Sequence, residues 1–67
     1  MREQILNIIN NTDKPVRARD IAGEIGKWVC EVAIECSLMA DEGLIKQTTY
    51  RDAANMEFYY LYGKREG

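Results

Sequence analysis

The sequence predicts one small α+β domain in which three helices precede a two-stranded β-hairpin. The chain has 67 residues, of which 46% are hydrophobic and 30% charged. That length and composition allow one core, near the lower size limit for a stable domain. The N-terminal two thirds show apolar residues at helical spacing, interrupted by two turn signals. The remainder alternates in the manner of strands on both sides of a polar turn.

The first two helices are expected over roughly residues 2–10 and from about Ala18 to Gly26. A helical apolar stripe marks the first: Ile5, Leu6, Ile8 and Ile9. A cluster of turn-forming residues at 10–15 ends it, and Val16 is expected to make a short edge-strand contact before the second helix. Gly26 can adopt the left-handed conformation that favours a helix end.

The third helix is expected from Lys27 or Trp28 to about Asp41, with two different sides. Its core side comprises Trp28, Val29, Val32, Cys36, Met39 and Ala40. Its opposite side comprises Cys30, Ile34, Ser37 and Asp41, with Glu31 and Leu38 on the flank. We expect Trp28 to anchor the core; the alternative is an exposed side chain that contacts a partner or DNA sugar.

The hairpin is expected to follow Gly43, with strands over 44–50 and 56–62 and a turn over 51–55. Alternation places Tyr59 and Leu61 on one face of the second strand and the remaining aromatic residues on the other. That second set is Phe58, Tyr60 and Tyr62. One set is expected in the core; the other covers a sheet edge, joins an interface or stacks on single-stranded nucleic acid.

The order of these elements resembles the winged helix-turn-helix family, in which the hairpin is the wing. The matching residues are Val16, Asp20–Ile21–Ala22, Gly26, Val32, Met39, Gly43–Leu44–Ile45 and Tyr59–Tyr60–Leu61. Residues 15–22 also resemble the small enterobacterial fimbrial-operon regulators, and a phage or plasmid regulator would share these features. The resemblance implies a DNA-binding transcriptional regulator.

The third helix departs from the DNA-reading pattern of that family. It carries no Arg or Lys after Lys27, and positions 34, 37 and 38 are Ile, Ser and Leu rather than basic or polar readers of bases. The net charge of −2 also disfavours tight autonomous binding to DNA. We therefore expect double-stranded DNA to be gripped mainly through its phosphates. The expected contacts are Arg17, Arg19, Lys27, Lys46, Thr48, Arg51 and Asn55, although each also suits an ordinary solvated surface.

A second apolar stripe on the third helix gives an alternative function. Cys30, Ile34 and Leu38 lie in line on the side that faces away from the expected core. Glu31 and Glu35 flank them and would repel phosphates. This side is expected either to bind a protein partner or second copy of the chain, or to be a solvated surface with scattered apolar residues.

Composition disfavours several other classes. The chain has no His, a single Ser and no glycine-rich phosphate loop, so we expect neither an enzyme nor a cofactor. Cys30 and Cys36 are roughly 120° apart around one helix, which prevents their pairing and fits no zinc site. Unpaired thiols favour a reducing, cytoplasmic location, and the sequence contains no apolar run long enough for a membrane span.

Overall fold

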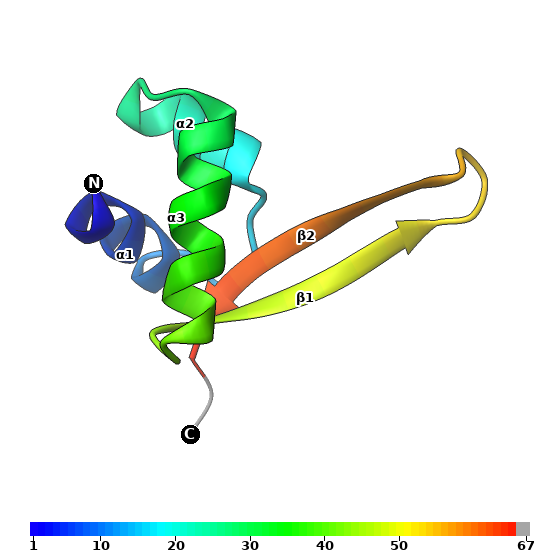
Figure 1. Ribbon diagram of the computed structural model, residues 1–67. Coiled ribbons are helices and arrows are strands. Elements are labelled where there is room, and N and C mark those ends of the chain that lie inside the picture. Colours follow the sequence, from blue (N-terminus) through cyan, green and yellow to red (C-terminus); the bar gives the residue numbers. More distant parts are fainter. Residues whose placement is uncertain (66–67) are drawn as a thin grey trace.

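The computed structural model describes residues 1–65 as three helices followed by an antiparallel hairpin (Figure 1). The elements are α1 (Arg2–Asn10), α2 (Ala18–Ile25), α3 (Val29–Asp41), β1 (Ile45–Asp52) and β2 (Glu57–Lys64). The helices gather around the base of the hairpin, and the rest of the hairpin projects away from them. The α+β class is confirmed, and the layout is consistent with a winged helix. None of the helices in residues 1–65 is long and apolar enough to cross a membrane.

Local signals in the sequence explain where α2 begins and where α2 and α3 end. The backbone N–H of Arg17 donates to Oδ2 of Asp20 at 3.3 Å, which stabilises the start of α2. Gly26 ends α2 with a φ of 69°, and Gly43 follows α3 with a φ of 79°. Both positions require the left-handed region that glycine enters without a steric penalty, as the sequence predicted for Gly26.

A short backbone bridge joins the helices to the hairpin. Val16 N–H donates to the Tyr62 carbonyl at 2.8 Å, and Tyr62 N–H donates to the Val16 carbonyl at 2.7 Å. This confirms the expected edge-strand contact of Val16. The Tyr62 side chain is 1% exposed and hydrogen-bonds Ser37 of α3. The bridge and this side chain together fix the base of β2 against the helical core.

The core draws residues from every element. Its fully buried members are Ile5, Ile9, Ile21, Ala22, Val32, Cys36, Met39, Ile45 and Tyr62. The helices contribute one face each, at the spacing that amphipathic helices show. The face expected for α3 is correct from Val32 onwards.

The expectation that Trp28 and Val29 belong to the core is wrong. Trp28 is 76% exposed and Val29 is 47% exposed. Trp28 is the N-cap residue, with φ −70° and ψ 141°, so it lies before the helix and its side chain does not follow the helical face. Val29 occupies the first turn, at the end of α3 farthest from the base of the hairpin (Figure 1).

The turn of the hairpin is shorter than expected. The strands extend to Asp52 and from Glu57, and the residues between them form the turn. The Asp52 carboxylate accepts from the Ala54 N–H at 3.0 Å and from Nδ2 of Asn55 at 2.9 Å. These bonds stabilise a tight turn of the Asx type, which permits longer pairing of the strands.

Arg2 connects the start of α1 to α3. Its guanidinium pairs with the carboxylates of Glu35 and Glu42, and Nη1 lies 3.0 Å from Oε1 of Glu42. The hydrogen bond from Arg2 lowers the pKa of Glu42 from its ordinary value of 4.5. The folded state thus favours the ionised form of Glu42.

This pairing predicts a pH-dependent contribution to stability. A lowered pKa in the folded state stabilises the fold above pH 4.5 and loses that effect as pH falls through the lowered value. Glu42→Gln should therefore lower the thermal midpoint at neutral pH, and its difference from the parent should vanish in acid. Circular dichroism melts across that range measure this, with Glu24→Gln on the exposed side of α2 as control. A difference that is constant with pH would contradict the role of the carboxylate.

Candidate functional site

The two faces of the hairpin differ in chemistry, and each forms part of a separate hollow. Pairing of Tyr50 with Tyr59 and of Arg51 with Phe58 sets the register of the strands. Side chains alternate along a strand, so Phe58 and Tyr60 share the face of Tyr62. That face lines a hollow together with α3, whereas Lys46 and Thr48 of the other face line a hollow with the loop before α2.

The hollow on the loop side has a basic rim. Its volume is ≈ 300 Å³, and its lining residues are Thr12, Asp13, Lys14, Pro15, Lys46, Thr48, Gly63, Lys64 and Arg65. We call the four cations, Lys14, Lys46, Lys64 and Arg65, the basic cradle. Among residues 1–65, Asp13 is the only carboxylate residue in this lining. The cradle therefore forms a local region of positive charge on an acidic chain.

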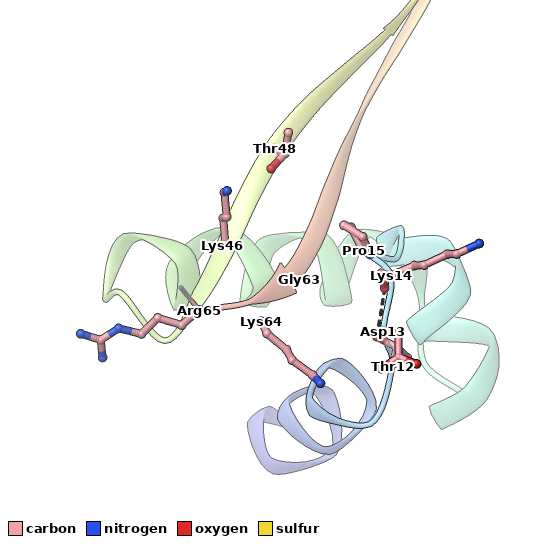
Figure 2. Close-up of a pocket in the computed structure, with 9 residues that line it drawn as sticks. All are labelled: Thr12, Asp13, Lys14, Pro15, Lys46, Thr48, Gly63, Lys64 and Arg65. Carbon is pink, nitrogen blue, oxygen red and sulfur yellow. Dashed lines mark hydrogen bonds between the residues drawn. The ribbon is translucent and has the colours of Figure 1, made fainter. Parts of the chain in front are cut away.

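Local contacts hold the loop that supplies Lys14. The Thr12 hydroxyl donates to the Ile9 carbonyl at 3.2 Å or the Lys14 carbonyl at 3.0 Å, so it ties the loop to the end of α1. Pro15 lies against Gly63 of β2. Figure 2 shows that the charged ends of the cradle spread around the rim and do not converge on one point. Cations that diverge in this way do not suit a single small anion.

Arg17 lies over the Tyr59 ring, on the face of the hairpin that carries Lys46 and Thr48. Its guanidinium carbon lies 4.0 Å from the centroid of the Tyr59 ring, and the Tyr59 ring stacks on Tyr50 with centroids 5.0 Å apart. The stacked guanidinium keeps its edge N–H groups available as donors. One face of Tyr59 is covered by Arg17, which reduces the aromatic surface offered to a nucleic-acid base.

The other residues expected to contact DNA lie apart from the cradle. Lys27 lies in the exposed turn between α2 and α3, and Arg19 lines a hollow on the α3 side of the hairpin. Arg51 is exposed near the tip, opposite Phe58. Asn55 donates to Asp52 within the turn. The structure thus places Lys46 and Thr48 at the basic cradle. It disperses the other four residues just described.

Sequence reasoning did not select Lys64 and Arg65. Their signal was the adjacent Lys-Arg pair at the end of the second strand, but the strand was expected to end at residue 62. In the observed register Lys64 pairs with Ile45 and Lys46 pairs with Gly63, so the two lysines project from opposite faces at the base of the hairpin. Both line the same hollow because it lies at this base, next to the loop before α2.

The α3 side of the hairpin carries two adjoining hollows that share Ala33, Tyr60 and Tyr62, and we call them together the helix–hairpin groove. Its large apolar residues are Val29, Ile34 and Leu38 of α3 with Phe58 and Tyr60 of β2, and Arg17 and Arg19 also line it. Ile34 is 64% exposed, Leu38 47% and Phe58 65%. Phe58 and Tyr60 contact each other edge to face, with centroids 6.5 Å apart. Cys30, expected to belong to the same surface, is exposed, but Val29 and Ala33 occupy the corresponding part of the groove.

Comparison with protein-family models, with curated proteins and with solved structures found no match.

The two thiols should differ in reactivity. Cys30 is exposed, whereas Cys36 is buried and its burial raises the pKa to about 11. A thiol reagent at neutral pH should modify one cysteine in the native protein and the second only after unfolding, because the thiolate is the reacting form. Absorbance titration measures this, and Cys30→Ser should remove the fast reaction. Equal reaction rates for both thiols in the native protein would contradict the burial of Cys36.

Proposed function

We propose that the protein is a winged helix-turn-helix regulator of transcription that binds double-stranded DNA chiefly through phosphates, at the basic cradle. The observation that carries this proposal is the gathering of Lys14, Lys46, Lys64 and Arg65 around one hollow in which, among residues 1–65, Asp13 is the only carboxylate residue. Cations that neutralise phosphates release counterions, which supplies affinity independent of sequence. Because the four charged ends diverge, they would meet separate phosphates rather than one anion.

Arg17 extends the basic surface along the sheet. It is half-buried and oriented by its contact with Tyr59, so less side-chain freedom is lost when it meets a phosphate. Thr48 adds a hydroxyl that can donate to a phosphate oxygen. Five cations in contact would give a slope of log affinity against log salt of roughly −4 to −5.

The exposed side of α3 does not favour base readout. Ile34 and Leu38 are large apolar residues there, and Glu31 is a neighbouring exposed carboxylate. Insertion of this side into a major groove would bring the carboxylate near phosphates and offer no bidentate donor to a base edge. The proposed binding therefore positions the protein on DNA and discriminates weakly between sequences.

Mutation of the cradle tests the proposal. Lys46→Ala and Lys64→Ala should each weaken binding to a generic duplex and reduce the salt slope by about one, because each removes one phosphate contact. Fluorescence anisotropy at several salt concentrations measures both quantities. Lys27→Ala, in the turn between α2 and α3 and outside the cradle, is the matched control and should change little.

Two results would overturn this assignment. Absence of binding at low salt would reject DNA as the ligand. Weakened binding in Lys27→Ala and Arg51→Ala, with the cradle variants unchanged, would move the contact to the third helix and the hairpin tip.

A further inference from the structure

The helix–hairpin groove has two apolar walls that the chain leaves exposed. The first wall is the outer side of α3, where Glu31, Ile34, Leu38 and Asp41 follow one another at spacings of three and four residues. Residues at this spacing lie in one line along a helix. The wall is therefore an apolar centre with a carboxylate at each end.

The second wall is the face of the hairpin that carries Tyr62. Phe58 and Tyr60 project from this face, and Arg51 lies directly opposite Phe58 in the strand register. Arg19 lines the same hollow from α2. This wall is an apolar centre with cations near it, and its charge is opposite to that of the first wall.

The fold does not bring these two walls into full contact. The hairpin diverges from α3 as it leaves the helices (Figure 1), and both walls keep large exposed fractions. Both walls are apolar at their centres and carry opposite charges near those centres. A second copy can therefore cover what one copy leaves open. We propose that two copies form a two-fold dimer in which the hairpin of each lies against α3 of the other.

The available area is adequate for such a dimer. The exposed parts of Val29, Ile34, Leu38, Phe58 and Tyr60 amount to on the order of 400 Å² of apolar surface per copy. Interfaces are about 60% apolar, so the contact would bury roughly 1,300 Å² in total, within the range of stable complexes. A two-fold axis makes every contact occur twice. In the proposed dimer Arg51 of each copy meets Glu31 of its partner.

The dimer does not require the proposed DNA contact. Lys14 and Lys46 lie outside the two walls, whereas Lys64 projects from the face of Tyr62 at the base of the hairpin and Arg17 lines the groove. Failure of DNA binding would leave the dimer untouched, and a monomer could still bind DNA through the cradle.

Sedimentation equilibrium over a wide range of protein concentrations tests the dimer. We expect a concentration-dependent mass that approaches twice that of the chain. Leu38→Glu should raise the dissociation constant at least about a hundredfold, because it introduces a charge at two symmetric contacts. Leu44→Glu is the control, since Leu44 is similarly exposed, at 39% against 47% for Leu38, and does not belong to either wall. Circular dichroism verifies that both variants fold.

A charge exchange tests which walls meet. Arg51→Glu and Glu31→Arg should each weaken the dimer about tenfold or more, and the chain with both changes should recover most of the loss. A mass equal to one chain at every concentration would overturn the proposal. Dimerisation that is unaffected by Leu38→Glu, or single charge variants without rescue in the double variant, would equally overturn this interface.

Discussion

The backbone bridge between Val16 and Tyr62 is the constraint on which the arrangement of the surface depends. Its two hydrogen bonds fix the register of β2 against the segment before α2, and the buried Tyr62 side chain fixes which face of the hairpin meets the helices. Because side chains alternate, this one choice places Phe58 and Tyr60 toward α3 and Tyr59 on the other face. A slip of one residue would exchange the two faces.

The consequence is a separation of charge and apolar surface that composition alone does not show. An acidic chain presents a basic cradle because its cations from the loop, β1 and the end of β2 line one hollow at the base of the hairpin. The large exposed apolar residues lie on α3 and on the Phe58 face of β2, and the carboxylates Glu31 and Asp41 lie on α3. The four residues of the cradle differ from those of the two walls, so phosphate contact and protein contact need not compete for the same residues. They would compete if α3 entered the major groove of DNA.

Much of the architecture was predictable because its signals are local. The stripe of α1 and the left-handed Gly26 each depend on a few neighbouring residues, and Val16 was identified from its place between a turn cluster and a helix although its partner Tyr62 is distant. Trp28 was misplaced because helical periodicity was extended to the N-cap, where it no longer applies. Lys64 and Arg65 were missed for a different reason: their hollow joins three distant segments, and the second strand was expected to end at residue 62.

The projecting hairpin connects the two proposals through geometry. A two-stranded ribbon is marginally stable in water by itself, and this one carries exposed aromatic residues beyond the support of its own helices. A second copy that covers those residues would stabilise the ribbon and fix the direction of both hairpins. It would also hold two basic cradles in a constant relation. Two linked weak phosphate sites bind a polyanion more tightly than either alone, since the second contact becomes intramolecular. Dimerisation thus offers a small acidic chain a physical route to useful affinity without basic residues on α3.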